Sequence, residues 1–447
     1  MNNFLACDWK TPAAWLAVTA YAFIWAIGLV GWRTARRRYR SRPASPLQSS
    51  SDAPGVSILR PLKGLDWNLF ENLESTCRQR YPKFEIIFSV ADENDQALQV
   101  IEELRQKYPE VVIKVIIGAE DVGVNPKVNN LMRPYKQATY DILWVLDSNV
   151  IMDPGALARA VDALLTQRGD KPIGLVHHVP FAITYDHTGL GNRVEEAFLN
   201  TNHAKMYLAI NTVALESCVT GKSCMYRRSD LERVNASFRP ADIPSEESWR
   251  GFGERRGYGM EAFGRFMAED AMIGLSVWHE LGKRHDLSCD IAKNVLAKMS
   301  FMDYVWRRVR WIRVRKNMVF AATLAEPLTE SIVVGLYGAW AISHLTGGGI
   351  PMWLMLLVHF SCWITVDLDV YMSLAGHPVP KRQQMGFFQA WCIRELCAFP
   401  IWAVAMFGNT IEWRGNLYRM KKNGEAAVVE GPAESGYEAV PTAGPGS

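Results

Sequence analysis

The chain has 447 residues, enough for one large domain together with membrane segments. Its net charge of +3 is close to neutral, so we expect no general affinity for nucleic acid and predict no nucleic-acid partner. Hydrophobic residues make up 49% of the chain, which is within the ordinary globular range, but they cluster at its two ends. Groups of basic residues lie beside these apolar runs, and this distribution predicts contact with a lipid bilayer.

The N-terminal region contains an apolar run, Ala13 to Trp32, of about the length needed to cross a bilayer. A signal peptide would have basic residues before the run and a small-residue cleavage site after it, and neither is present. A buried core helix is the other alternative. We predict a signal-anchor helix over residues 1–32 and a basic linker over 33–54. The positive-inside rule then keeps the following domain in the cytosol, because the run is followed by Arg33, Arg36, Arg37, Arg38, Arg40 and Arg42.

Residues 55–325 read as one α/β domain. Short apolar segments alternate with amphipathic ones, a pattern typical of a mostly parallel, Rossmann-like sheet. The expected helices cover 66–80, 95–108 and 154–166. The expected strands are Val56 to Leu59, Phe84 to Val90, Val111 to Ile117, Asp141 to Leu146 and Ile173 to His177.

Within this domain, residues 239–259 are polar, glycine-rich and charged, which predicts an inserted loop or lid. The sequon at Asn235 could carry a glycan only if the domain were lumenal. The 8 cysteines are scattered without paired C-x-x-C spacing, so a zinc site is not expected. A disulfide between Cys218 and Cys224 is an alternative to free thiols, which we favour for a reducing compartment.

Apolar character returns over residues 326–408, in segments near 332–345, 351–374 and 387–407. Ionisable side chains in these segments must be paired or face protein. Four spans in total would leave the basic tail on the lumenal side, so we expect one C-terminal segment to be re-entrant or to lie in the interface. Residues 409–447 are predicted as a basic juxtamembrane segment and a disordered tail. The ionisable residues concerned are Asp367, Asp369, Arg394 and Glu395.

Two aspartates follow predicted strands directly. Asp92 comes after the strand ending at Val90, and Asp147 comes after the strand ending at Leu146. Ligands of open α/β sheets bind beyond the carboxyl ends of strands, where a carboxylate can accept hydrogen bonds from a nucleotide or hold a divalent metal. Aspartate is also common after strands simply because it forms turns, so each residue alone leaves both interpretations open.

Glu269 and Asp270 follow the glycine-rich insert and open a predicted helix. A carboxylate there can cap the helix, but it can also act as a general base on an acceptor hydroxyl. Arg307 and Arg310 share one helix face, followed by Trp311. Arginines suit a diphosphate leaving group, although a basic amphipathic helix lying on lipid headgroups is the alternative.

Together, two aspartates at strand ends, a later Glu-Asp and Arg-x-x-Arg-Trp resemble the D, D, D, (Q/R)xxRW signature of lipid-directed glycosyltransferases with the GT-A fold. Longer segments resemble ceramide glucosyltransferase (glucosylceramide synthase) over most of residues 55–419. These segments are SILRPLKG at 57–64, VGVNPKVNNLM at 122–132, CVTGKSC at 218–224 and EWRGNLYR at 412–419. The resemblance implies a GT-A catalytic domain with transmembrane helices at both ends.

The resemblance also implies roles for individual residues. Asp270 would be the catalytic base, and Asp147 would help to hold a divalent cation, Mg²⁺ or Mn²⁺, against the diphosphate. Asp147 is followed by Ser148 and Asn149 instead of a second carboxylate, which departs from a full D-x-D. Substrate-binding residues would be Asp92, Lys127, His203 and Glu269, although a core or surface position is the alternative for His203. Diphosphate binding and the shape of the acceptor site would depend on Arg307, Arg310 and Trp311.

The implied reaction transfers glucose from UDP-glucose to the primary hydroxyl of ceramide. One base without a carboxylate nucleophile indicates single displacement, with inversion to a β-glucoside. Related transferases using another lipid or sugar, a chain-forming polysaccharide synthase and an inactive scaffold are the alternatives. The implied location is the Golgi or ER membrane with the domain facing the cytosol, and the oligomeric state stays open. The length of the 239–259 insert resembles the fungal branch of the family.

Overall fold

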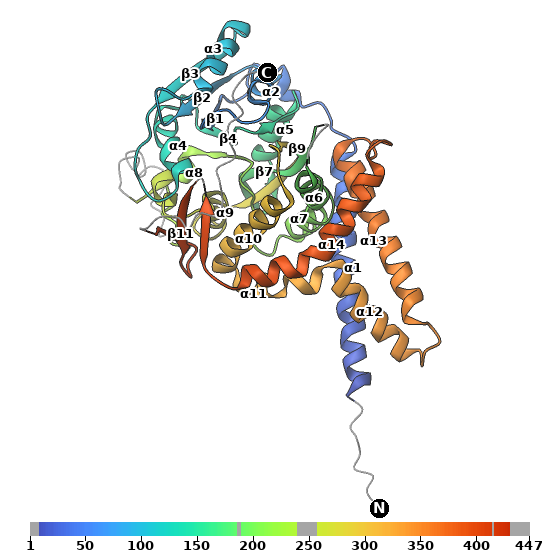
Figure 1. Cartoon of the computed structure of the whole chain (residues 1–447). Coiled ribbons are helices and arrows are strands. Elements are labelled where there is room, and N and C mark those ends of the chain that lie inside the picture. The colour runs from blue at the N-terminus through green and yellow to red at the C-terminus, as the bar shows by residue number, and fades with distance from the viewer. Residues whose placement is uncertain (1–8, 186–188, 239–256, 414, 430–447) are drawn as a thin grey trace, which may run out of the picture.

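The structure is a computed structural model, and it describes residues 9–185, 189–238, 257–413 and 415–429. A rounded α/β domain lies at one end of the molecule, and a group of long helices extends from it (Figure 1). Most of the predicted 239–259 insert, together with Arg414 and the tail from residue 430, lies outside the described residues.

The domain is built on a nine-stranded mixed sheet in the order β3-β2-β1-β4-β8-β7-β9-β5, with β6 paired to β7. The first four strands are parallel, whereas β8 runs antiparallel to both β4 and β7. The strands are β1 (Val56–Leu62), β2 (Phe84–Val90), β3 (Val112–Ile117), β4 (Ile142–Leu146), β5 (Val150–Ile151), β6 (Gln167–Arg168), β7 (Lys171–Ile183), β8 (Ser223–Arg227) and β9 (Arg284–Val295).

Helices cover both faces of this sheet, because alternate side chains of the buried strands point to opposite sides. On one face, Ile58 and Trp144 pack in a cluster with α2 (Leu69–Cys77), α3 (Ala97–Lys107) and α5 (Ala156–Leu165). On the other face, Leu59 and Leu143 pack in a cluster with α4 (Pro126–Gln137) and α9 (Glu269–His279). The predicted α/β class is confirmed.

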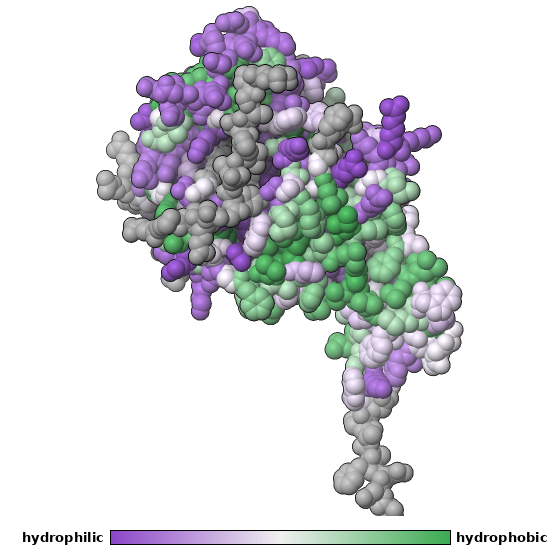
Figure 2. Space-filling model, in the orientation of Figure 1, coloured by the Kyte–Doolittle hydropathy of each residue, from purple (hydrophilic) through white to green (hydrophobic). Residues whose placement is uncertain are grey.

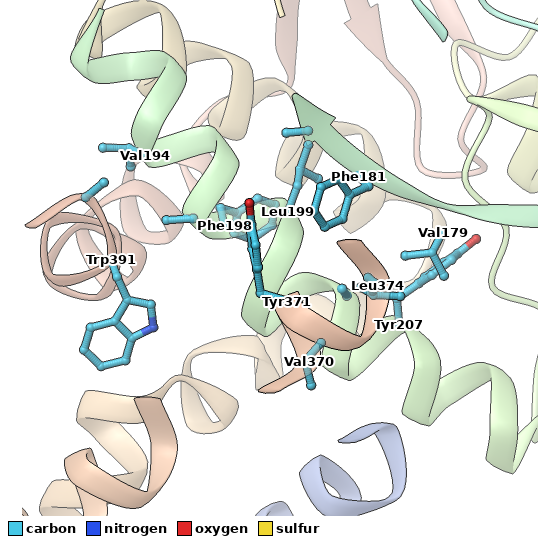
Figure 3. Close-up of a cluster of buried hydrophobic side chains, with 14 of the residues drawn as sticks. Val179, Phe181, Val194, Phe198, Leu199, Tyr207, Val370, Tyr371, Leu374 and Trp391 are labelled. Carbon is cyan, nitrogen blue, oxygen red and sulfur yellow. The ribbon is translucent and has the colours of Figure 1, made fainter. Parts of the chain in front are cut away.

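A helical junction joins the sheet to the apolar helices. It consists of α6 (Leu190–Phe198), a π-helical turn (Leu199–His203) and α7 (Ala204–Val213). Figure 3 shows Phe181 of β7 and Phe198 of α6 meeting Tyr371 of α13 (Met352–Ala375) within one buried cluster. The hydrophobic core therefore continues from the domain into the membrane helices.

Two helices of the described residues are long and apolar enough to cross a membrane: α1 (Lys10–Tyr39) and α13. The shorter α12 (Ser331–Leu345) lies between them in the bundle and runs antiparallel to α1, since Thr11 contacts His344. Helix α13 runs parallel to α1, because Trp32 donates to Asp369 near the ends where both helices meet the domain. The chain thus leaves the domain along α12 and returns along α13, which keeps the C-terminal region beside the domain.

The remaining helices lie against the domain instead of extending from it (Figure 1). Helix α14 (Gln384–Met406) packs on α6 and on α10 (Phe301–Met318), and the short α11 (Phe320–Ala325) follows α10. Exposed apolar side chains gather on this side, continuous with the long helices (Figure 2). They include Trp306, Phe320, Leu324, Leu328, Phe388, Leu396 and Phe399.

The ionisable residues within the C-terminal helices are paired, as expected. Asp367 lies 2.7 Å from Lys205 of α7 and accepts a hydrogen bond from Trp391. Arg394 binds Glu330 at 2.6 Å and also pairs with its neighbour Glu395. Asp369 binds Arg40 at 2.5 Å. The pair of Lys205 and Asp367 joins α13 to α7, and the other pairs join the apolar helices to one another.

The structure departs from the sequence prediction in several elements. Strand β7 extends well beyond His177, and the sheet is mixed because β8, β5 and β6 run antiparallel to the strands beside them. Residues 410–428, part of the region predicted as a juxtamembrane segment and disordered tail, form a small sheet of β10 (Thr410–Trp413), β11 (Asn416–Met420) and β12 (Ala426–Val428). Glu425, between β11 and β12, forms an antiparallel β-bridge with Phe266 of the α/β domain. This bridge gives backbone groups of both segments hydrogen-bond partners, and composition alone does not predict it.

Candidate active site

Asp147 lies at the carboxyl end of β4 and is held between two lysines. Its Oδ1 lies 2.8 Å from Lys127 Nζ, and its Oδ2 lies 3.0 Å from Lys222 Nζ. Burial alone would raise the pKa of the Asp147 carboxyl, but the two ammonium groups hold that pKa well below its usual range. Burial would likewise lower the pKa of Lys127, which Asp147 and Glu269 instead hold well above its usual value. Asp147 and Lys127 therefore both carry charge at neutral pH.

Arg60, a fully buried residue of β1, holds the loop that carries Asp147 in place. Its guanidinium donates to the carbonyl oxygens of Asp147, Ser148 and Val150 at 2.8, 3.1 and 2.9 Å. The other guanidinium nitrogen donates to α2, at Asn72 O and Thr76 Oγ1. One buried cation thus satisfies the carbonyl groups of a tight loop and sets the position of the Asp147 carboxylate.

Glu269 is the first residue of α9 and forms an ion pair with Lys127. Its Oε1 lies 2.8 Å from Lys127 Nζ, and its Oε2 accepts a hydrogen bond of 2.9 Å from Asn125 Nδ2. Asn125 is also the N-cap of α4, where its side chain accepts from the backbone of Lys127. The start of α4 and the start of α9 are therefore fixed against each other, and Lys127 bridges two carboxylates.

Asp270 lies beside Glu269 and faces Gly221 of the loop before β8. A Cβ added at Gly221 would lie 2.5 Å from Asp270 Cγ, so only glycine allows this approach. Burial among protein atoms, together with the neighbouring Glu269 carboxylate, raises the pKa of Asp270 to about 7. A carboxylate with a pKa near the working pH is well suited to accept a proton from a hydroxyl group.

These groups form the polar end of one cavity. Lys127, Gly221, Glu269 and Asp270 line it, and the other lining residues are almost all apolar. They come from α4, the sheet, the short 3-10 helix Gly259–Phe263 and α9: Leu131, Val145, Leu175, Cys224, Tyr226, Met260 and Ile273. Cys218 and Cys224 are both free thiols, as expected.

Arg307 of α10 lies close to the site. Arg307 donates to Glu195 Oε1 at 2.9 Å and lies close enough to Lys222 to lower its pKa. Trp311 lies one turn further along α10, with the Arg307 guanidinium 5.0 Å from its ring centre. Arg310 is half-buried on the same helix. Arg307 therefore lies close to the pair of Asp147 and Lys222.

Asp92 and His203 lie further out. Val145 of β4 and Ile87 of β2 both pair with Leu59 of β1. Asp147 follows Val145 by two residues and Asp92 follows Ile87 by five, so Asp92 lies three residues further beyond the carboxyl ends of the strands. Asp92 is exposed and accepts a hydrogen bond from the backbone of Asn94, as in a turn. His203 ends the π-helical turn and stacks on Tyr207, whose hydroxyl accepts from Thr220 N at 2.9 Å. One side chain therefore separates His203 from the loop of Gly221.

Four residues of this site were not singled out from the sequence: Arg60, Asn125, Gly221 and Lys222. Each lies within a segment that carried the family resemblance, and only the pairing of β4 with β8, Leu146 opposite Ser223, brings Lys222 next to Asp147. A strand pairing between segments so far apart leaves no local trace in the sequence, so the resemblance was the only available signal.

The predicted metal ligand does not have the surroundings of a metal site. Both oxygens of Asp147 face ammonium groups, and Ser148 after it donates to Asp66 instead of adding a carboxylate. Within the described residues, no group of three His, Cys, Asp or Glu side chains could hold a metal ion. A hard dication needs several oxygen ligands, so the residues present do not fit one.

Comparison with known proteins identifies the family of this fold and site. The sequence matches Glycosyl transferase family 21 over residues 17–235 and 254–426. The chain belongs to glycosyl transferase family 21. It is therefore a glycosyltransferase, and the matched range includes the sheet, the Asp147 and Asp270 region and the C-terminal helices.

Curated relatives of this family-21 chain are similar over nearly their whole length. The ceramide glucosyltransferase of Komagataella phaffii is 35% identical and covers 91% of this chain and 89% of its own. The ceramide glucosyltransferase of Candida albicans is 32% identical, and the match spans 83% of this chain and 87% of the relative. Ceramide glucosyltransferase 3 of Caenorhabditis elegans is 28% identical over 92% and 82%.

Among solved structures, a mannosyltransferase from Pyrobaculum calidifontis in complex with GDP-mannose and Mn²⁺ is similar to the family-21 chain. The two share 16% identity over 86% of this chain and 99% of the other, with a TM-score of 0.43.

Proposed function

We propose that the protein transfers glucose from UDP-glucose to the primary hydroxyl of ceramide, giving β-glucosylceramide. The observation that carries this proposal is a cavity of a family-21 transferase lined by Lys127, Glu269 and Asp270, in which Lys127 also binds Asp147. Relatives up to 35% identical are ceramide glucosyltransferases, which supports ceramide as the acceptor.

In the proposed reaction, Asp270 accepts the proton of the acceptor hydroxyl while that oxygen attacks the anomeric carbon. The bond from that carbon to the diphosphate breaks as the new bond forms, which inverts the configuration. The diphosphate leaves as an anion, and preorganised positive charge lowers the barrier to its departure. Lys127 and the arginines of α10 supply that charge, with Trp311 shaping the acceptor side.

The donor nucleotide would extend from the diphosphate towards the exposed edge of the sheet. Asp92 lies on that edge and is free of the lysine cluster, so we propose that it accepts a hydrogen bond from the nucleoside. Glu269 holds Lys127 in place, and His203 lies behind the Gly221 loop on the lipid side. The residues around Asp147 do not fit Mg²⁺ or Mn²⁺, and no step above depends on either ion.

The membrane arrangement supports a lipid acceptor. The arginine-rich end of α1 lies beside the domain, with Arg38 bound to Asp286 at 2.9 Å. By the positive-inside rule, we propose that the domain faces the cytosol, at the Golgi or ER membrane. The exposed apolar side of α10, α11 and α14 continues from the long helices (Figure 2), so ceramide would enter laterally from the bilayer.

A product assay tests the proposal. The full chain in nanodiscs is supplied with labelled UDP-glucose, UDP-galactose or UDP-N-acetylglucosamine, and with ceramide, a sterol or a hopanoid acceptor. Labelled β-glucosylceramide should form only with UDP-glucose and ceramide. Efficient labelling of a different lipid, or with a different sugar, would instead support a related lipid glycosyltransferase.

A further inference from the structure

Strands β10 and β11 contain most of the segment EWRGNLYR, which carried part of the family resemblance and has no role in the proposed reaction. The small sheet of β10, β11 and β12 packs beside three elements of the candidate active site. Its apolar side chains contact the loop before α4, the segment before α9 and helix α10. The contacting residues are Ile411, Trp413, Tyr418, Met420 and Ala426 of the small sheet with Val124, Met267 and Val314. The small sheet is therefore joined to the elements that carry Lys127, Asp270 and Arg307.

Residues 264–266 precede α9 and are bound on one side by the small sheet. The backbone N–H of Ala426 donates to Arg265 O at 3.0 Å. Glu425 forms the β-bridge with Phe266, and its carboxylate lies 3.3 Å from the guanidinium of Arg265. These contacts fix the backbone that leads into the Glu-Asp pair at the start of α9.

The other side of residues 264–266 is bound by Asn125. Its backbone N–H donates to Gly264 O at 2.9 Å, and its Nδ2 donates to Phe266 O at 2.7 Å. The same amide donates to Glu269 at 2.9 Å, and Asn125 is the N-cap of α4. Hydrogen bonds therefore continue from the small sheet through residues 264–266 to the starts of α4 and α9.

The turn between β11 and β12 reaches α9 and α10. Gly424 has a φ of 81°, and a Cβ added there would lie 2.4 Å from Met272 Cε of α9 and 3.0 Å from Met318 Cγ of α10. Helix α10 also binds β10, since Arg313 donates to Thr410 O at 2.8 Å. The small sheet thus links the helix that begins with the Glu-Asp pair to the helix that carries the Arg-x-x-Arg-Trp motif.

We propose that the small sheet is a positioning element of the active site, in which the contact of Glu425 and Ala426 with residues 264–266 sets the Asp270 carboxylate against α10. None of the contact residues touches substrate in this role, because they act through the backbone that leads into α9. A small misplacement of a reacting group is costly, so loss of this contact lowers turnover. The inference rests on the proposed function only for the role of Asp270 as the base.

Ala426→Pro tests this contact, because proline lacks the N–H that donates to Arg265 O. Val428→Pro is the matched control: Val428 lies on the same outer edge of β12, and its N–H has no hydrogen-bond partner among the described residues. In nanodiscs we expect Ala426→Pro to lower kcat by about tenfold. The acid limb of its kcat/KM profile should move to lower pH, since a less buried Asp270 has a lower pKa. Ala426→Gly keeps the N–H and should retain most of the wild-type rate.

A second pair of variants applies if Ala426→Pro does not fold. Gly424→Leu places a side chain against Met272 and Met318. Gly415→Leu is its control, because Gly415 has the same left-handed backbone, with a φ of 80°, and open space around it among the described residues. Gly424→Leu alone should reproduce the loss of turnover and the shift of the pH profile.

Hydrogen exchange of residues 264–272 gives a readout without substrate, and exchange should be faster in Ala426→Pro than in Val428→Pro. Wild-type kcat and a wild-type pH profile in Ala426→Pro would overturn the proposal, and so would an equal loss of turnover in Val428→Pro. If wild type labels another lipid or uses another sugar, only the proposed function fails, because the variants are then compared with those substrates.

Discussion

Gly221 faces the carboxyl group of Asp270 so closely that a Cβ at residue 221 would lie 2.5 Å from Asp270 Cγ. Gly221→Ala should therefore displace Asp270, and we expect kcat to fall by about tenfold or more, since a small misplacement of a reacting group is costly. Steady-state transfer kinetics in nanodiscs measure this change. Gly28→Ala is the control, because its Cβ would meet Lys205 only at 3.8 Å. Unchanged kcat in Gly221→Ala would show that the approach is not needed for catalysis.

Asp270→Asn should abolish transfer while UDP still binds. The amide keeps the shape of the side chain but cannot accept the hydroxyl proton, and general-base catalysis contributes about 10²–10⁴-fold to rates. Product formation and UDP calorimetry on the same preparation separate the two effects. Substantial remaining turnover would refute the assignment of Asp270 as the base.

The pH dependence should follow the same carboxyl group, which Glu269, Lys127, Asp147 and the Cys224 thiol surround. With its pKa raised to about 7, Asp270 becomes protonated as the pH falls, so kcat/KM should decrease below about pH 7. A profile of kcat/KM from pH 5 to 9 measures this effect. A profile that stays flat down to pH 5 would contradict it.

The raised pKa also has a consequence for stability. A carboxyl group with a higher pKa in the folded state contributes stability below its unfolded pKa and loses it as the pH rises through about 7. Asp270→Asn removes that loss, so its thermal midpoint relative to wild type should be higher at pH 8 than at pH 5. Thermal unfolding of both proteins at the two pH values tests the sign.

Arg60 should be a positioning residue for the Asp147 loop. Arg60→Met removes the hydrogen bonds to three carbonyl groups of that loop, and unsatisfied buried groups cost about 1–3 kcal/mol each. We expect a lower thermal midpoint and weaker UDP binding than in Arg80→Met, a change at an exposed arginine. Equal midpoints and equal UDP affinities for the two variants would contradict this role.

The pair of Lys205 and Asp367 should hold the catalytic domain on α13. Asp367→Ala leaves the buried Lys205 ammonium without its partner, which typically costs about 3–5 kcal/mol. The double variant Lys205→Met with Asp367→Leu should recover most of the loss, measured as the thermal midpoint in detergent. Lys136→Ala, which breaks an exposed pair with Glu120, is the control and should have little effect. A double variant as unstable as Asp367→Ala would show that the charge is not the cause.

The sequence by itself determined the parts of this protein that depend on local pattern. The strand over Phe84–Val90 was predicted with the bounds that the structure has, because a short, largely apolar run between turn residues favours a buried strand. The long apolar helices at both ends and the aspartate after β4 follow from the same reasoning. Position at a helix start and helical spacing pointed to Asp270 and Arg307, whereas Lys127 came from the family resemblance alone.

Only the tertiary structure decided which of these groups meet. Lys222 reaches Asp147 through an antiparallel pairing of β4 with β8, and Arg60 reaches the same loop through the core. The contacts of α1 with α12 and α13 set the path of the C-terminal helices, which hydropathy had left open. The physical reason is the same in each case: these contacts join residues far apart in the chain, and no local preference encodes them.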